Sequence, residues 1–176
     1  PKGVMYDMGG LTRSFSTMGF PLLGLAPPAD AADVAGLVKG VVDAGGGITS
    51  MPCAPLMHGT GVWLGAMIPQ LSGATVVTLE NRSLDADEVL RTAQAEKVTN
   101  LIIVGDSFAK PILRAFDAAA EAGTPYDLSA IRMIISSGVM WTAEVKEQLL
   151  ERVEQAILLD AMGSSEGSMG NSISMK

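Results

Sequence analysis

Short runs of apolar, β-branched residues alternate with helix-length segments through most of this chain, and no other sequence feature limits the fold as much. Strands are predicted over residues 48–52, 74–79, 99–104, 131–136 and 156–161. Helices are predicted between them, over residues 60–72, 85–97, 107–122 and 142–154. Buried strands joined through helices form βαβ units, which assemble into parallel sheets. The sequence therefore predicts an α/β fold of three layers, with helices on both faces of a predominantly parallel sheet.

The first part of the chain lacks this alternation. Residues 1–29 are interrupted by glycine and proline pairs, so irregular structure is predicted there. Residues 30–44 carry an apolar stripe at helical spacing and predict one helix. We therefore expect an irregular segment plus one helix over residues 1–47 and an α/β subdomain over residues 48–176. Because the sequence starts with Pro1 and shows no signal-peptide pattern, we expect that it either starts inside a longer protein or has lost the residues before it.

Charge and cysteine content narrow the function classes. Twelve basic residues against 19 acidic ones give a net charge of −7, which argues against nucleic-acid binding, since that needs clustered Lys and Arg. Cys53 is the only cysteine, so no intramolecular disulfide can form, and a reducing, cytoplasmic location is expected. The apolar runs are too short to cross a membrane. If neighbouring parts are missing, apolar surface meant for them is expected to promote self-association.

Functional residues are expected where the parallel strands end, because open α/β sheets bind ligands there. Residues 163–167 follow the last predicted strand and match the G-x-S-x-G nucleophile elbow of serine hydrolases, with Ser165 as the nucleophile. That triad needs a histidine after the serine, but the only histidine, His58, comes far before it. The same segment also suits a phosphate-binding turn in which Glu166 holds Mg²⁺. A third interpretation is a polar turn without a ligand.

A second candidate segment, residues 55–61, follows the first strand of the alternation and reads Pro-Leu-Met-His-Gly-Thr-Gly. Its glycines would let a ligand approach the backbone closely, which favours a functional His58. An exposed or structural histidine is the alternative. No G-x-G-x-x-G follows any predicted strand, so a Rossmann-type dehydrogenase is disfavoured. A non-catalytic α/β module that binds a nucleotide or a protein remains open.

Four segments in this order resemble the adenylate-forming superfamily of acyl-CoA synthetases. Residues 1–6 resemble the end of its phosphate loop, T-S-G-T-T-G-x-P-K-G-V, and residues 55–61 match its P-L-x-H-x-x-G segment. Residues 136–141 stand where the family has S-G-G-A-P-L, and residues 160–166 match the frame of N-x-Y-G-x-T-E. The resemblance covers residues 1–6 and about 48–170. It implies one subdomain of a larger adenylation domain.

The resemblance implies roles for the residues around the phosphates. Glu166 ligates Mg²⁺, and Ser165 forms a hydrogen bond with the α-phosphate in place of the family's threonine. Gly163 and Ser164 belong to the same nucleotide-binding turn. Lys2 belongs to the mobile phosphate loop, whose glycine-rich half is not in this sequence.

A second group of residues is implied to bind adenine. Asp160 stands where an Asn or Asp side chain binds the adenine amino group. Residues 137–139, which are Ser137, Gly138 and Val139, line the base with their backbone. Met162 replaces the family's tyrosine, which keeps an apolar, polarisable contact and loses ring stacking. Met140 replaces the family's proline.

The resemblance also implies the reaction and its substrates. His58 lies beside the acyl carboxylate, and Gly61 and Trp63 shape one wall of an acyl pocket for a fatty or other apolar acid. The acid reacts with ATP to give an acyl adenylate, and coenzyme A then displaces AMP. The sequence leaves open whether coenzyme A or a carrier-protein thiol accepts the acyl group. Alone, the chain is expected to be inactive, because the ribose-binding Asp and the catalytic Lys of the family lie beyond it.

Overall fold

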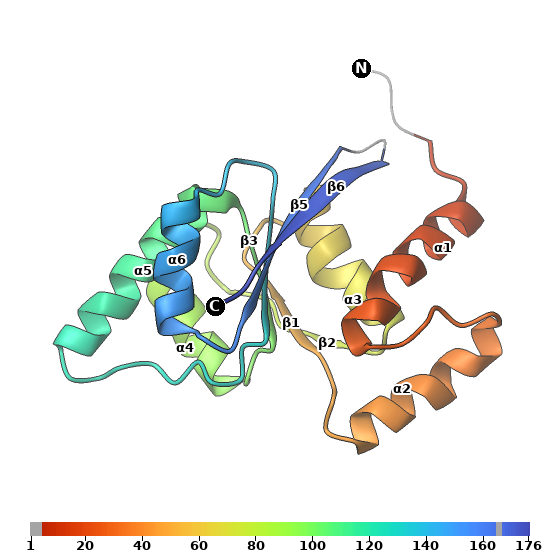
Figure 1. Ribbon diagram of the computed structural model, residues 1–176, viewed down its shortest axis with the longest axis horizontal. Coiled ribbons are helices and arrows are strands. Elements are labelled where there is room, and N and C mark those ends of the chain that lie inside the picture. The colour runs from red at the N-terminus through yellow and green to blue at the C-terminus, as the bar shows by residue number, and fades with distance from the viewer. Residues whose placement is uncertain (1–4, 165–166) are drawn as a thin grey trace.

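The computed structural model describes residues 5–164 and 167–176, which form a six-stranded sheet with helices on both faces (Figure 1). The strands are β1 (Thr49–Pro52), β2 (Thr75–Val76), β3 (Asn100–Ile103), β4 (Met133–Ser137), β5 (Ile157–Ser164) and β6 (Gly167–Ser174). Their spatial order is β2-β1-β3-β4-β5-β6, with every neighbouring pair parallel except β5 and β6. The predicted three-layer α/β fold is confirmed.

The helices divide between the two faces of the sheet. Helices α4 (Ala86–Ala95), α5 (Gly105–Glu121) and α6 (Ala143–Arg152) cover one face in Figure 1. The other face carries α1 (Met8–Gly19), the π-helical segment η3 (Thr60–Met67) and its continuation α3 (Ile68–Leu71). Helix α2 (Val34–Asp43) lies farther from the sheet, and the 3₁₀ turns η1 (Phe20–Leu23) and η2 (Ala31–Asp33) precede it. None of the described helices is both long and apolar enough to span a membrane.

Local chemistry explains where α4 begins and how it is held. The Asp85 carboxylate accepts hydrogen bonds from the backbone N–H groups of Asp87 and Glu88, which satisfies donors that the first helical turn leaves free. The buried Glu88 carboxylate in turn accepts the N–H groups of Glu80, at 2.6 Å, and Asn81, at 3.2 Å. These bonds fix the connection between β2 and α4.

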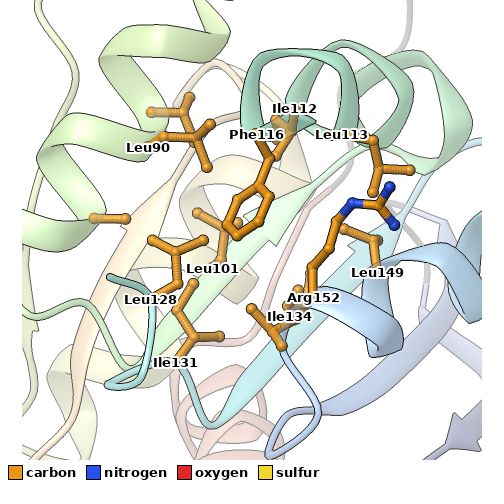
Figure 2. A pocket seen from close by; sticks show the side chains of 13 residues that line it. Leu90, Leu101, Ile112, Leu113, Phe116, Leu128, Ile131, Ile134, Leu149 and Arg152 are labelled. Carbon is orange, nitrogen blue, oxygen red and sulfur yellow. The ribbon is translucent and has the colours of Figure 1, made fainter. Parts of the chain in front are cut away.

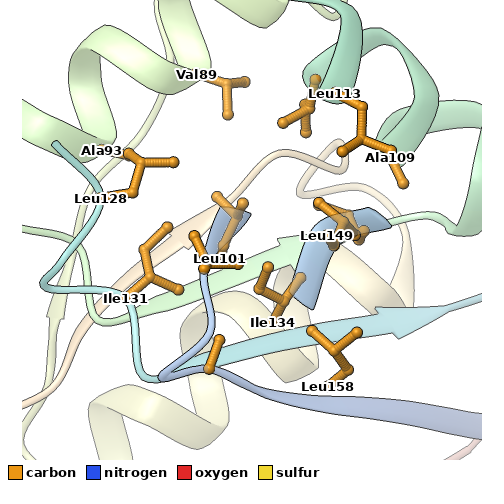
Figure 3. Packing of buried hydrophobic residues seen from close by; sticks show 14 of the residues in the cluster. Val89, Ala93, Leu101, Ala109, Leu113, Leu128, Ile131, Ile134, Leu149 and Leu158 are labelled. Carbon is orange, nitrogen blue, oxygen red and sulfur yellow. The ribbon is translucent and has the colours of Figure 1, made fainter. Parts of the chain in front are cut away.

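The hydrophobic core lies between the sheet and helices α4, α5 and α6 (Figure 3). It includes Leu101 and Ile134 from the sheet and Leu113 and Leu149 from the helices. A residual space of about 20 Å³ remains among these side chains, with Phe116 and Arg152 at its edge (Figure 2). This space has room for about one water-sized sphere, so it reflects packing rather than a ligand site.

Four elements differ from the sequence-based expectation. The strand predicted over residues 74–79 is only β2 (Thr75–Val76), and the strand predicted over residues 156–161 continues as β5 to Ser164. Residues 8–19 form helix α1 although irregular structure was predicted over residues 1–29. Asp7 begins that helix by accepting the Gly10 N–H at 2.6 Å, and the buried Phe15 anchors it. At the other end, the glycine- and serine-rich residues 167–174 form β6, which gains its backbone hydrogen bonds from β5. The predicted division at residue 47 stays a prediction.

Candidate nucleotide-binding edge

The carboxyl ends of β1, β3 and β4 bring loops from distant parts of the sequence to one edge of the sheet. The register pairs Ile103 with Ser136 and Ser137 with Ala161. The loops after β3 and β4 therefore leave the sheet side by side, next to β5. This is the edge at which the sequence placed its candidate residues, and at which open α/β sheets bind ligands.

Asp106, at the start of α5, connects the loops after β3 and β4. Its carboxylate accepts the backbone N–H of Thr142 at 2.9 Å and the Thr142 hydroxyl at 3.0 Å. Its own N–H donates to the carbonyl of Met140 at 3.1 Å, and Lys110 pairs with its carboxylate at 3.1 Å. Asp106 thus holds the segment before α6 at two backbone groups, the carbonyl of Met140 and the N–H of Thr142.

Gly105 and Ser136 bring the same two loops into close backbone contact. The Gly105 N–H donates to the Ser136 hydroxyl at 2.8 Å. Gly105 has φ +47°, and a Cβ at this position would overlap the Met140 carbonyl oxygen and lie 2.7 Å from the Val139 side chain. Only glycine combines this backbone conformation with this approach.

Replacing Asp106 by alanine is expected to lower the free energy of unfolding by about 1–3 kcal/mol, because the half-buried Thr142 amide loses its acceptor. Burial alone raises the pKa of Asp106, but hydrogen bonds from Thr142 and Lys110 outweigh it and hold that pKa below its ordinary value. Such a carboxylate stabilises the fold above its unfolded-state pKa of about 3.9, and this stabilisation is lost as the pH falls through the folded-state value.

Urea denaturation checks this expectation for the Asp106→Ala variant. The difference in the free energy of unfolding between the parent and the variant should be largest at about pH 7 and smaller at about pH 2.5. Asp43→Ala is the control, since Asp43 forms an exposed pair with Lys39 within α2 and should matter little at either pH. An Asp106→Ala deficit that is the same at both pH values would contradict the assignment.

The predicted adenine-binding residues lie together where β4 ends beside the middle of β5. Ser137 is buried as the last residue of β4, and Gly138 follows with φ +99°, a conformation that favours glycine. The apolar side chains next to them are open to solvent: the exposed fraction is 51% for Val139, 79% for Met140 and 60% for Met162. Exposed apolar side chains beside a held backbone loop suit the flat, apolar faces of a ligand ring.

Asp160 has a partner that the sequence did not predict. Its carboxylate lies 3.0 Å from the ammonium group of Lys146, on α6, and both side chains are largely buried. The same ammonium group lies 5.2 Å from the ring centroid of Trp141. Trp141 is itself buried, and its indole N–H has no hydrogen-bond partner among the described residues.

His58 lies at the turn between β1 and η3, and its side chain is exposed. Its backbone N–H donates to the Pro55 carbonyl at 3.0 Å, and its carbonyl accepts the Val62 N–H at 2.9 Å. These bonds begin the helical segment that carries Gly61 and Trp63. Trp63 contacts the ring of Tyr6 edge-on at 5.7 Å between centroids, so the N-terminal segment and η3 meet here.

The segment η3 packs on β1 through its glycines. Gly61 is buried, and a Cβ there would lie 2.6 Å from the Ala54 carbonyl oxygen. One turn later, a Cβ on Gly65 would lie 2.5 Å from the Cβ of Pro52, and the Gly65 carbonyl accepts the Ser50 hydroxyl at 2.8 Å. The predicted helix over residues 60–72 is thus confirmed, with a π-helical first part of a kind often found at functional sites.

A cavity of about 310 Å³ opens beside the loop after β1. Its walls come from residues 52–56, from residues 78–79 and 81–84 between β2 and α4, and from Phe108. Cys53 belongs to this wall, and burial together with the nearby Glu88 raises the pKa of its thiol to about 12. A thiol with this pKa stays protonated and is a poor nucleophile at neutral pH.

Three predicted site residues, Lys2, Ser165 and Glu166, lie outside the described residues, as does the side chain of Ser164. Gly163 lies at the bulge where β5 and β6 shift register. Within residues 5–164 and 167–176, no group of three His, Cys, Asp or Glu side chains could hold a metal ion. The metal role of Glu166 therefore stays a prediction.

Sequence reasoning missed Asp106 and Lys146 as parts of this edge. Asp106 lies two residues after a predicted strand, so its position was a usable signal. Lys146 gave no signal, because a lysine on an amphipathic helix is ordinarily exposed, and only the tertiary fold brings it to Asp160.

The three-layer sheet gathers loops from distant parts of the chain at one edge, and known proteins are similar to this chain in sequence. The model of the AMP-binding enzyme family matches residues 1–175. The medium-chain acyl-CoA ligase Mig of Mycobacterium avium is 37% identical over 124 residues, or 69% of this chain and 21% of that protein. The 3-oxocholest-4-en-26-oate–CoA ligase of Rhodococcus rhodochrous is 32% identical, over 70% of this chain and 22% of that protein. The chain belongs to the AMP-binding enzyme family, and it spans about a fifth of the length of these relatives.

Solved structures share the fold at lower sequence identity. The anthranilate CoA ligase AuaEII in complex with anthranoyl-AMP matches with a TM-score of 0.62 and 21% identity, over 72% of this chain and 23% of that one. A long-chain-fatty-acid-CoA ligase from Archaeoglobus fulgidus matches with a TM-score of 0.58 and 13% identity, over 80% and 29%. The resemblance to adenylate-forming enzymes is confirmed, and it disfavours the serine-hydrolase interpretation of Ser165.

Proposed function

We propose that the protein containing this chain is an AMP-forming acyl-CoA synthetase. It would activate a carboxylic acid with ATP, release pyrophosphate and transfer the acyl group from AMP to coenzyme A. The observation that carries the proposal is the edge at which the loop over residues 138–142, held by Asp106, follows β4 beside Asp160 and Ala161 of β5. Membership in the AMP-binding enzyme family supports it. A cytoplasmic location belongs to the same proposal.

The proposed reaction explains why no nucleophilic side chain is needed. A carboxylate oxygen of the acid attacks the α-phosphorus of ATP, the bond to the pyrophosphate oxygen breaks, and a mixed anhydride forms. The thiolate of coenzyme A then attacks the acyl carbon, and AMP leaves. Both steps depend on positioning and on charge neutralisation rather than on a protein nucleophile. The single histidine and the protonated Cys53 thiol are consistent with this requirement.

Mg²⁺ would neutralise charge on the phosphates in the first step. This ion is commonly held by one or two carboxylates together with phosphate oxygens and water, so the single carboxylate of Glu166 suits it. The lack of a three-ligand cluster in the described part of the chain is compatible with such a site. Ser165 and Ser164 would add hydroxyl groups next to the α-phosphate.

The acid is proposed to be a medium- or long-chain fatty acid or a similarly bulky apolar acid. Two relatives are named as ligases of such acids, a medium-chain acid and 3-oxocholest-4-en-26-oate. In this chain, His58 lies in the turn before η3 and Trp63 lies within η3, and both would shape one wall of the acyl pocket. Residues 58–65 contain no carboxylate, which suits a hydrocarbon tail.

Mass spectrometry of reaction mixtures tests the substrate class. The complete protein would be incubated with ATP, Mg²⁺ and coenzyme A and with acids of two, eight and sixteen carbons in parallel. Acyl-CoA and AMP are expected in equal amounts with the longer acids and only traces with acetate. Acetyl-CoA as the main product would contradict the proposed acid, and ADP in place of AMP would contradict the proposed reaction.

A further inference from the structure

The contact between Lys146 and Asp160 joins α6 to the middle of β5. Lys146 lies near the N-terminus of α6, where the helix dipole disfavours a positive charge. Only 14% of its side chain is exposed, against 23% for Asp160, and their charged groups lie 3.0 Å apart. The buried ring of Trp141 lies on another side of the ammonium group, 5.2 Å away. A lysine placed against the dipole and removed from solvent is held there by these two partners.

The contact leaves one oxygen of the carboxylate available. Lys146 donates to Oδ2 of Asp160, and Oδ1 has no donor among the described residues. In the sheet register Asp160 pairs with Ser136, one residue before the predicted adenine-binding segment begins at Ser137. The free oxygen thus belongs to a carboxylate that is fixed in place beside that segment.

We propose that Lys146 is a positioning residue that orients Asp160 to accept a hydrogen bond from the 6-amino group of adenine. This inference rests on the proposed function, in which Asp160 contacts the base. The ammonium group of Lys146 holds Oδ2 and so fixes the rotamer of the Asp160 side chain before the nucleotide binds. Oδ1 can then accept a hydrogen bond from adenine without a further loss of side-chain entropy. It also offsets the carboxylate charge, which would otherwise repel the phosphates of the nucleotide.

The same arrangement explains a preference among purines. Adenine carries an N–H donor at position 6, which complements a carboxylate oxygen. Guanine and hypoxanthine carry a carbonyl oxygen there, which would face the carboxylate as a second acceptor. A nucleotide without any group at position 6 would bind without gaining this bond.

The test compares the binding of AMP with that of purine riboside 5′-monophosphate, which lacks only the 6-amino group. Isothermal titration of the complete protein would measure both dissociation constants for the parent and for Lys146→Met and Lys146→Arg. The parent should bind AMP about tenfold more tightly than the analogue, as expected for a hydrogen bond to a charged acceptor. Lys146→Met should lose this preference by weakening AMP alone, and Lys146→Arg should retain most of it.

Lys39→Met serves as the matched control, because Lys39 also pairs with an aspartate but is exposed on α2. It should leave both dissociation constants unchanged. If Lys146→Met proves unfolded by circular dichroism, Lys146→Gln keeps a neutral donor of similar shape and should show a reduced preference. Equal weakening of both nucleotides, or no change in either, would overturn the inference.

The outcome also separates this inference from the proposed function. Formation of acyl-CoA together with equal binding of AMP and the analogue by the parent would overturn the role of Lys146 and Asp160 and leave the reaction standing. An absence of AMP binding and of acyl-CoA formation would overturn both.

Discussion

Valine at position 61 is expected to destabilise the protein by about 3 kcal/mol or more, one of the two largest effects predicted for a single substitution. The Gly61 Cα faces the carbonyl oxygens of Ala54 and Pro55, and a Cβ would lie 2.6 Å from the first and overlap the second. Both are backbone atoms of the loop after β1, so neither can rotate away as a side chain would. The segment η3 would have to move off β1 or unfold.

Chemical denaturation of the Gly61→Val protein measures this effect. Gly36→Ala and Gly40→Ala are the controls, because each lies within α2 with no atom near the added Cβ. These controls should be neutral or more stable by up to about 1 kcal/mol, since alanine favours a helix over glycine. If Gly61→Val unfolds at the same denaturant concentration as the parent, the packing of η3 on β1 has been described wrongly.

The second large effect is expected for the replacement of Glu166 by alanine. Loss of a Mg²⁺ ligand should reduce the rate of adenylate formation about 100-fold or more, because charge stabilisation by a bound metal contributes several kcal/mol to the transition state. The melting temperature should stay unchanged, as the proposed role concerns the ligand and not the fold. Single-turnover formation of acyl-AMP, followed by rapid quench, measures the step directly.

Glu154→Ala is the control for this substitution, since Glu154 is an exposed acidic residue paired with Lys176. It should retain full activity. Raising the Mg²⁺ concentration should partly restore Glu166→Ala if the defect is weakened metal binding. Parental rates for Glu166→Ala at limiting Mg²⁺ would show that another residue holds the metal.

The sequence predicted the sheet well because its strands are buried on both faces. Such strands read as continuous apolar runs, as in residues 101–103 and 133–135, and the helices between them indicate parallel pairing. Strand β6 gave no such signal, since residues 167–174 are mainly glycine and serine and pair only because β5 offers an edge. Helix α1 was missed because the Gly9-Gly10 pair suggested a turn, whereas in the structure it lies in the first helical turn after Asp7.

The sequence predicted which residues belong to the candidate site. It did not predict the hydrogen bonds and the ion pair that connect them. The sequence placed Ser137 and Gly138 at the end of one strand and Asp160 within the next, and the sheet register brings these two strands together at Ser136 and Asp160. The bonds that hold this edge, from Asp106 to Thr142 and from Lys146 to Asp160, join residues 36 and 14 positions apart. Contacts of this kind depend on how helices pack on the sheet, which residue types and spacing do not specify.

The measurement that tests the central claim most directly is the exchange of radiolabelled pyrophosphate into ATP by the complete protein. Adenylate formation is reversible before the thiol acts, so an acid that is activated at the α-phosphorus drives this exchange without coenzyme A. We predict exchange that requires Mg²⁺ and a medium- or long-chain fatty acid and that is absent when the acid is omitted. Acyl-CoA formation without any acid-dependent exchange, or no exchange with any carboxylic acid, would contradict the account.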